Sequence, residues 1–176
     1  MADRLKRNLI LRTERMLLRP MTEKDMADGL AILLSSEVAK TYMLPDFPDR
    51  KDAEEMFMRL ARMSASPDRM MYGMEMDGHI VGWIHAVDDS GETVEVGYAV
   101  NPSWQGRGCA TEAMKAIIAE LFRMGCERVS AAYFEGNAAS RRVMEKCGMK
   151  ESGKTEEIEY RNQMRRCVYL EIKSDI

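Results

Sequence analysis

The fold of this 176-residue chain is decided by residues 93–123, which read TVEVGYAVNPSWQGRGCATEAMKAIIAELFR. The first eight of these residues are rich in β-branched side chains and predict a strand. A turn with two glycines follows, and apolar side chains then recur at helical spacing over three turns until Gly125 ends the helix. Residues 128–134 are apolar and short enough for a buried strand. We therefore predict a parallel, right-handed crossover of strand, helix and strand.

Further strands and helices surround this unit. Residues 70–76 and 79–87 flank Asp77-Gly78, a two-residue hairpin signal, and a second turn at 88–91 leads into the strand at 93–100. These three strands predict an antiparallel meander. The remaining predicted elements are a strand at 16–20, a helix from Thr22 through Leu34, a helix from Asp49, a helix from Asn137 to Gly148, and either two strands or one long strand within 159–173. The order predicts a mixed α/β (α+β) fold with a central, mostly antiparallel sheet.

Composition and charge narrow the class of protein. Hydrophobic residues make up 45% and charged residues 31% of the chain, which is an ordinary globular balance. We see no repeat or linker and expect a single domain spanning residues 1–176. The longest run without Asp, Glu, Lys or Arg is 96–106, too short to span a membrane, and no apolar signal core follows Met1. The net charge of −3, with acidic and basic residues interleaved, argues against a nucleic-acid partner.

The cysteines indicate reduced thiols and no metal site. They form no CxxC pair, and the chain has two histidines to join them, His79 and His85. Structural zinc is therefore not expected. Reduced cysteines are typical of cytoplasmic proteins, so we expect a cytoplasmic location. The four residues are Cys109, Cys126, Cys147 and Cys167.

The turn between strand and helix has the chemistry of an anion site. Glycines let backbone N–H groups approach an anion closely, and the start of a helix adds roughly half a positive charge from its dipole. Such a loop can hold a pyrophosphate. A mononucleotide loop requires Gly-Lys-Ser/Thr, which is absent, and a dinucleotide fingerprint fails because Thr111 stands at its third glycine. The remaining pattern is Q-x-x-G-x-A, formed by Gln105, Gly108 and Ala110.

This hexad resembles the acyl-CoA pyrophosphate loop of the GNAT acetyltransferase superfamily. Three further stretches strengthen the resemblance: Glu95–Val100 before the loop, Ala110–Ala113 after it, and Asn137-x-x-Ser140 with Lys146, Gly148 and Met149. The last of these, and the opening Arg15–Thr22, look like the branch that acetylates the N-termini of ribosomal proteins. The resemblance covers about residues 13–171 and implies a GNAT-like fold with acetyl-CoA as co-substrate.

The resemblance assigns the acetyl-CoA contacts by position. The strands on either side of the helix are expected to splay apart, with pantetheine in the gap. Val100 would offer backbone groups to pantetheine, Asn137 would contact it through its side chain, and Thr111 would lie behind the pyrophosphate. The phosphates could also be screened by Arg107, Arg141 and Lys146, or these could be surface charges. The backbone amides that would hold the pyrophosphate belong to Gln105, Gly106, Arg107, Gly108, Cys109 and Ala110.

The same resemblance implies direct attack of an amine on the acetyl thioester. Glu95 stands where some members place a carboxylate base that acts through water, although it could equally be an outward residue of its strand. Many members use a tyrosine as the acid, but Met144 occupies that position here, so Ser140 is the predicted acid, with Tyr98 and Tyr133 as reserves. His85 could face the acceptor pocket or pack in the core. A covalent role for Cys109 is not expected, because the family transfers the acetyl group directly.

The acceptor is predicted only as a primary amine. A protein N-terminus, a polyamine, an aminoglycoside and an amino-acid-like metabolite stay open. An α-amino group, with a pKa near 8, loses its proton more easily than a lysine, with a pKa of about 10.4. The predicted acceptor side combines aromatic and acidic residues with methionines: Tyr42, Met43, Phe47, Met63, Trp83, Glu156, Glu157, Glu159 and Tyr160.

Two other functions and one assembly are the alternatives to this interpretation. A CoA-binding sensor without turnover would carry the same loop, because the loop reports binding alone. A nucleotide-binding oxidoreductase is disfavoured by Thr111 and by the meander before the loop. Exposed methionines near 70–76 would be compatible with the edge of a homodimer.

Overall fold

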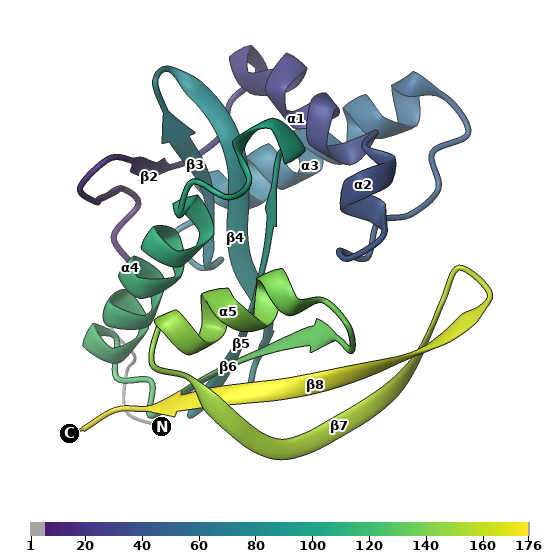
Figure 1. Cartoon of the computed structure of the whole chain (residues 1–176). Helices are drawn as coiled ribbons and strands as arrows, with labels where there is room; N and C mark the ends of the chain where they lie inside the picture. The colour runs from purple at the N-terminus through teal and green to yellow at the C-terminus, as the bar shows by residue number, and fades with distance from the viewer. Residues whose placement is uncertain (1–5, 176) are drawn as a thin grey trace.

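The computed structural model describes residues 6–175, which form an eight-stranded sheet with helices on both faces (Figure 1). The strands lie across the sheet in the order β1-β2-β3-β4-β5-β6-β8-β7. The strand bounds are β1 Leu11–Arg12, β2 Leu17–Arg19, β3 Met71–Met76, β4 His79–Asp89, β5 Thr93–Val100, β6 Arg128–Phe134, β7 Lys150–Tyr160 and β8 Gln163–Lys173. The helices are η1 Glu23–Asp25, α1 Met26–Leu33, α2 Ser36–Ala39, α3 Arg50–Ala65, η2 Pro102–Trp104, α4 Cys109–Arg123 and α5 Ala138–Lys146.

The predicted crossover β5–α4–β6 is confirmed, and it opens the sheet. β5 and β6 pair in parallel, whereas the other neighbouring strands of the described chain run antiparallel. The parallel pairing covers only Thr93–Glu95 against Arg128–Ser130. Beyond Glu95, β5 continues against β4, and beyond Ser130, β6 continues against β8. The two strands therefore separate in the half of β5 that leads to the glycine turn.

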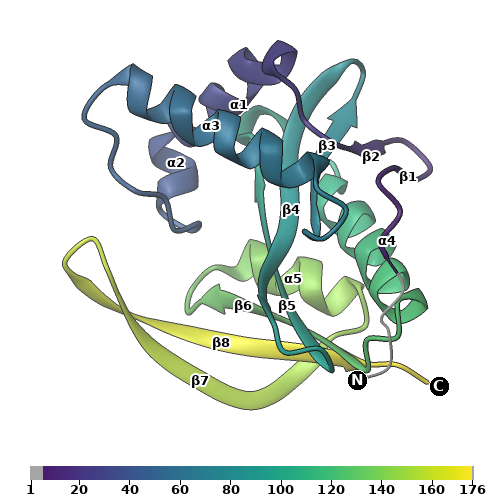
Figure 2. The same ribbon diagram turned by 180° about the vertical axis from the view of Figure 1, so that it is seen from behind.

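The two faces of the sheet carry different helices. α4 and α5 cover one face, where Val96 of β5 belongs to the same core cluster as Ile117 of α4 and Met144 of α5. α1 and α3 cover the other face, where Ala99 of β5 shares a cluster with Phe57 of α3. Figure 2 shows α3 lying across that second face. Because successive residues of a strand point to opposite faces, the even-numbered residues of β5 face α4 and α5, and the odd-numbered residues face the α1–α3 side.

The C-terminal segment forms a long hairpin. The sequence left open whether this segment was one strand or two; the structure has two strands of 11 residues each, β7 and β8, joined at Arg161-Asn162. Both turn residues have positive φ, 53° and 60°, as a tight hairpin turn requires. β7 begins at Lys150, nine residues before the predicted start. Figures 1 and 2 show the tip of the hairpin curving towards the α2 region.

One expectation about the N-terminal half is corrected, and two short elements there were not predicted. The methionines at 70–76 are buried, with Met71 and Met74 at most 1% exposed, because β3 lies inside the sheet between β2 and β4. They therefore offer no exposed edge for a second copy. The short elements β1 and α2 were also missed by the sequence patterns.

Within residues 6–175, no helix is long and apolar enough to cross a membrane.

Candidate functional site

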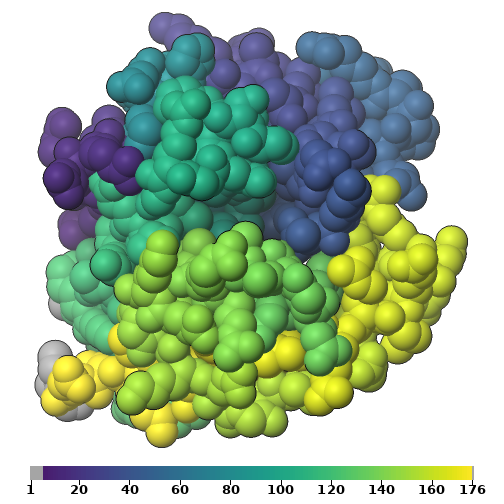
Figure 3. Space-filling model, viewed as in Figure 1, coloured from purple at the N-terminus to yellow at the C-terminus, as the bar shows by residue number. Residues whose placement is uncertain are grey.

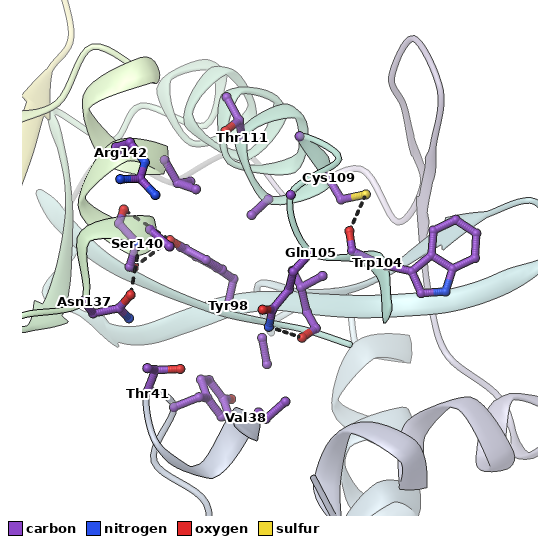
Figure 4. Close-up of a pocket in the computed structure, with 18 of the residues that line it drawn as sticks. Val38, Thr41, Tyr98, Trp104, Gln105, Cys109, Thr111, Asn137, Ser140 and Arg142 are labelled. Atoms are coloured by element: carbon purple, nitrogen blue, oxygen red, sulfur yellow. Dashed lines mark hydrogen bonds between the residues drawn. The ribbon is translucent and has the colours of Figure 1, made fainter. Parts of the chain in front are cut away.

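A cleft with a volume of about 380 Å³ lies where β5, the glycine turn, α2 and α5 meet. Figure 3 shows the glycine turn, α2 and α5 coming together at the surface, and Figure 4 shows Val38 and Thr41 across the cleft from Gln105 and Tyr98. The opening between β5 and β6 creates this space, because a continuous sheet would fill it. The residues that line the cleft include Tyr42, Tyr98, Gln105, Gly108, Asn137 and Ser140.

The glycine turn forms one end of the cleft. Gly106 and Gly108 have φ values of 74° and 80°, a conformation that glycine adopts without steric cost. Gly108 is also the N-cap of α4, so the chain passes directly from the turn into a 15-residue helix. Cys109 and Ala110, the first residues of that helix, line the cleft. The first N–H groups of a helix lack partners within it, so this end of the cleft suits an anion.

A network of hydrogen bonds behind the glycine turn connects it to the N-terminal segment. One oxygen of the Glu112 carboxylate accepts hydrogen bonds from the Thr13 hydroxyl (2.6 Å) and the Arg15 backbone N–H (2.7 Å). Its other oxygen accepts from Nε of Arg15 (2.8 Å). The Arg15 guanidinium then donates to the Arg107 carbonyl within the turn (2.9 Å). Arg15 therefore ties the turn to the first turn of α4, a role that the sequence patterns did not indicate.

The predicted phosphate contacts are only partly brought to the cleft. Gln105, Gly106, Gly108, Cys109, Ala110 and Thr111 line it. The Arg107 guanidinium instead lies over the Trp104 ring, 4.7 Å from its centre. Arg141 pairs with Glu145 and Glu151, while its neighbour Arg142 lines the cleft together with Lys146. Arg142 was not singled out from the sequence, because one position on a short helix decides which arginine faces the cleft.

Val100 and Asn137, the predicted pantetheine contacts, both line the cleft. The Val100 carbonyl accepts a hydrogen bond from the Gln105 side-chain amide (3.0 Å). Oδ1 of Asn137 accepts from the Ser140 backbone N–H (3.2 Å) and caps α5. This leaves the amide nitrogen of Asn137 as the group of its side chain suited to donate to pantetheine.

Tyr98 and Ser140 meet on the α5 side of the cleft. Their hydroxyl oxygens lie 2.7 Å apart. Burial raises the pKa of Tyr98 to about 12, and the contact with Ser140 offsets only part of that rise. The phenol is therefore protonated at neutral pH. Tyr133, the other reserve acid, is buried in β6 and lies outside the lining of this cleft.

Glu95 lies on the other face of β5 and outside the lining of the cleft. It is half-buried, and burial raises its pKa; Lys154 opposes this rise, and Glu156 and Asp88 add to it. Its odd-numbered position places it on the α1–α3 side of the sheet, together with Gly97 and Ala99.

The α2 side of the cleft carries a pair that sequence patterns could not assemble. The Tyr42 hydroxyl lies 2.8 Å from Nε2 of His85 and accepts a hydrogen bond from the Trp83 indole N–H (3.2 Å). Tyr42 follows α2, whereas Trp83 and His85 belong to β4. Of the predicted acceptor-side residues, Tyr42 and Trp83 are thus brought together, while Phe47 and Met63 pack against the core of the α1–α3 side.

Cys109 has the environment of a structural thiol. Its side chain is 2% exposed, and burial raises the pKa of the thiol. Its sulfur lies 3.8 Å from the Trp104 carbonyl oxygen. A nucleophilic cysteine needs the opposite shift, towards the thiolate. Across residues 6–175, no group of three or more His, Cys, Asp or Glu side chains is gathered as a metal site would require.

Comparison with known proteins identifies the family. Residues 15–150 match the model of the acetyltransferase (GNAT) domain, so the chain belongs to the GNAT acetyltransferases. The chain is 27% identical over 158 residues to YoaA of Bacillus subtilis, an uncharacterized N-acetyltransferase, with 87% of this chain and 89% of YoaA covered. It is 28% identical over 153 residues to YdaF of the same organism, a candidate ribosomal N-acetyltransferase, with 84% and 83% covered.

Comparison with solved structures supports the same family assignment. A GNAT-family acetyltransferase from Bacillus anthracis superposes with a TM-score of 0.80 at 25% identity, covering 93% of this chain and 98% of that one. The protein is therefore an N-acetyltransferase. A solved neighbour with the same fold, the microcin C7 self-immunity acetyltransferase MccE, was determined in complex with acetyl-CoA and superposes with a TM-score of 0.79 at 16% identity, covering 92% of this chain and 93% of that one. The resemblance to the acetyltransferases that modify ribosomal proteins is confirmed.

Proposed function

We propose that this enzyme transfers the acetyl group of acetyl-CoA to a primary amine by direct attack within a ternary complex. The observation that carries the proposal is the cleft itself: it runs from the glycine turn at the start of α4, past the gap between β5 and β6, to the wall formed by α2. In this proposal, the pyrophosphate of acetyl-CoA binds at the turn and its pantetheine arm binds in the gap. Holding both reactants in one cleft removes much of the entropic barrier to attack.

The acceptor proposed is the α-amino group of a protein or peptide. An N-terminal amine has a pKa near 8 and supplies far more of the neutral, attacking form at pH 7 than a lysine does. The name of YdaF, a candidate ribosomal N-acetyltransferase, supports the same class of acceptor. A small-molecule amine is the competing substrate class and belongs in the same assay.

Ser140 is the proposed acid for the departing thiolate of CoA, with the Tyr98 hydroxyl behind it at 2.7 Å. A thiolate that leaves on the α5 side meets this pair. On the opposite face of β5, Glu95 acts as the base only if water connects its carboxylate to the amine, because its side chain does not line the cleft.

Calorimetry of acetyl-CoA binding tests the proposal at the turn. Gly108→Glu places a negative side chain at the N-terminus of α4, where the pyrophosphate would lie, and should abolish binding. Gly91→Glu is the matched control, since Gly91 has a similar φ of 90°, has open space around its α-carbon, and lies in the turn before β5. Loss of binding in both variants, or in neither, would contradict the placement of the pyrophosphate.

Release of free CoA then tests turnover. Wild-type enzyme and acetyl-CoA are incubated with a peptide bearing a free α-amine, with the same peptide N-acetylated but carrying a lysine, and with spermidine. Release with the first peptide alone supports the α-amino proposal. Release with spermidine alone would replace it with a small-molecule acceptor, and tight binding without release to any amine would favour a sensor.

A further inference from the structure

The proposed function, on which this inference rests, needs a group that takes a proton from the attacking amine inside the cleft. Tyr42 lines the cleft, and His85 lies directly behind its hydroxyl at 2.8 Å. Glu95, the carboxylate on the same face of the sheet, does not line the cleft. The Tyr42–His85 pair thus reaches the cleft lining through Tyr42, whereas Glu95 does not; the carboxylate of Glu37, which also lines the cleft, is paired with Lys40 (2.7 Å).

The hydrogen bonds around the pair fix the direction in which each proton points. Nδ1 of His85 lies 3.1 Å from the Ala86 carbonyl oxygen, which can only accept, so Nδ1 carries the proton. Nε2 of the neutral ring is then an acceptor, and the Tyr42 hydroxyl donates to it. The Trp83 indole N–H can only donate, and it donates to the Tyr42 oxygen. The Tyr42 oxygen therefore points its own proton at His85, and one of its two acceptor positions is left for a further donor.

The pair lies on the opposite side of β5 from the proposed acid. In the register of β4 and β5, His85 is opposite Gly97 and Trp83 is opposite Ala99, and both odd-numbered residues face the α1–α3 side. Tyr98, between them, faces α5 and meets Ser140. A thioester in the gap beside β5 is thus reached from two sides, by Ser140 on one and by Tyr42 on the other.

We propose that Tyr42 and His85 form a relay that takes the proton of the attacking amine. As the amine nitrogen bonds to the acetyl carbonyl carbon, it gives one proton to the Tyr42 oxygen, and the Tyr42 hydroxyl proton moves to Nε2 of His85. Tyr42 ends neutral and His85 ends as an imidazolium. The C–S bond then breaks, and the thiolate takes the proton supplied by Ser140. Ser140 regains a proton from the Tyr98 hydroxyl, Tyr98 is reprotonated from solvent, and His85 loses its proton to solvent.

The surroundings keep His85 neutral and ready to accept. Burial lowers its pKa, and the hydrogen bond to the Ala86 carbonyl offsets only part of this. Two side chains face His85 from neighbouring elements: Met71 lies opposite it on β3, and Tyr42, which follows α2, contacts its Nε2. β5 carries Glu95 two residues from Gly97, on the same face. Tyr42 touches the substrate in this scheme, while His85 acts through Tyr42.

The variants His85→Gln, Tyr42→Phe and Glu95→Gln separate a relay from a merely structural contact. Glutamine can still accept the Tyr42 hydrogen bond but cannot take the proton, so His85→Gln keeps the contact and removes the base. We expect His85→Gln and Tyr42→Phe each to lower kcat about 100-fold. We also expect kcat of the wild type to fall at low pH as His85 becomes protonated. His85→Gln should lose this acid limb, whereas His79→Gln, which changes an exposed histidine at the start of the same strand and outside the cleft lining, should keep both the limb and a kcat within threefold of wild type.

Several outcomes would overturn the relay. His85→Gln with wild-type kcat and pH profile would show that the contact is structural. Loss of the acid limb in Glu95→Gln, but not in His85→Gln, would make Glu95 the base. Loss of acetyl-CoA binding by calorimetry in both His85→Gln and Tyr42→Phe would show that the pair shapes the cleft rather than moving protons. Absence of CoA release from the wild type with every amine is a different result, because it contradicts the proposed function before any variant is made.

Discussion

The hydroxyl oxygens of Tyr98 and Ser140 lie 2.7 Å apart, which links β5 to the first turn of α5 at the cleft. Either oxygen can donate to the other, so a proton that Ser140 gives to a thiolate can be replaced from Tyr98. Burial raises the pKa of Tyr98 to about 12, which keeps that proton in place throughout the neutral range. In the proposed mechanism, this pair supplies the proton that Met144, at the position where the resemblance places a tyrosine, cannot supply.

Ser140→Ala should lower kcat about 100-fold while leaving the affinity for acetyl-CoA within a few-fold, because the lost group acts on the departing thiolate. Tyr98→Phe should lower kcat as well, and the double variant should lose less than the product of the two single effects, since both residues serve one proton transfer. Steady-state kinetics with calorimetry measures both quantities. Tyr133→Phe, a buried tyrosine outside the cleft lining, is the control and should retain kcat; a Ser140→Ala enzyme with full kcat would contradict the assignment.

Glu112 links the glycine turn to the N-terminal segment, and its replacement should weaken both stability and binding. Glu112→Gln removes the charge that holds Thr13 and Arg15, at a cost of about 1–2 kcal/mol in the free energy of unfolding. Because Arg15 then loses its hold on the Arg107 carbonyl, the Kd for acetyl-CoA should rise several-fold. Thermal unfolding and calorimetry measure the two effects. Glu145→Gln, which breaks the exposed pair with Arg141, is the control and should cost less than 0.5 kcal/mol.

The same carboxylate predicts a dependence of stability on pH. Burial alone would raise the pKa of Glu112, but the hydrogen bonds from Thr13 and Arg15 outweigh it and hold the pKa below its usual range. A lowered folded-state pKa contributes stability that is complete above about pH 4.5 and is lost as the pH falls through the folded-state pKa. The difference in Tm between wild type and Glu112→Gln should therefore be largest near pH 7 and shrink below pH 4.5. A constant difference from pH 3 to pH 7 would contradict the ionic account.

Strong local signals made most of the fold predictable. The two-residue turn Asp77-Gly78 has φ values of 52° and 81°, which is the conformation that its residue types indicated. The long amphipathic stripe after the glycine turn became α4, with the predicted end near Gly125. Helices and turns of this kind are encoded within a few neighbouring residues, and sequence patterns detect them for that reason.

Elements that depend on distant partners were missed. β1 has 2 residues and α2 has 4, too few for a period to show. β7 is exposed along most of its length and rich in charge, so no alternation of apolar residues marks it; its pairing with β8 defines it as a strand. The candidate site shows the same difference between local and distant contacts. The contiguous turn was recognised, whereas the contacts of Tyr42 with His85 and of Arg15 with Glu112 join residues 43 and 97 positions apart.

Gly29 in α1 should resist the substitution that usually stabilises a helix. Alanine normally gains about 1 kcal/mol over glycine within a helix. A Cβ at Gly29, however, would lie 2.1 Å from the ring of Phe57 in α3, so the two helices would have to move apart. Gly29→Ala should therefore destabilise the fold by about 1–3 kcal/mol, as overpacking does. Chemical denaturation measures this, with the exposed Ala31→Gly as the control for helix propensity; a stabilised Gly29→Ala protein would contradict the packing.

Tyr160 fastens the tip of the β7–β8 hairpin to the region of α2 that walls the cleft. Its hydroxyl donates to the Ala39 carbonyl (2.7 Å) and accepts from the Leu44 N–H (3.2 Å), while its ring stacks on Phe134. Tyr160→Phe keeps the stacked ring but leaves the Ala39 and Leu44 backbone groups without this partner, which should cost about 1–3 kcal/mol. For a domain of this size, the Tm should fall by roughly 2–4 °C per kcal/mol.

Tyr160→Phe should also change the kinetics, and mainly the KM for the acceptor amine. Because the hairpin tip and the segment after α2 lie on the proposed acceptor side, we expect Tyr160→Phe to raise the KM for the amine several-fold and more than it raises the KM for acetyl-CoA. Two-substrate kinetics separates the two constants. Tyr169→Phe is the matched control, since it also removes a phenol hydroxyl from the hairpin, but one that donates to Glu156 (2.8 Å) and makes no tie to α2. An equal rise in both KM values, or the same acceptor effect in Tyr169→Phe, would show that the tip does not shape the acceptor site.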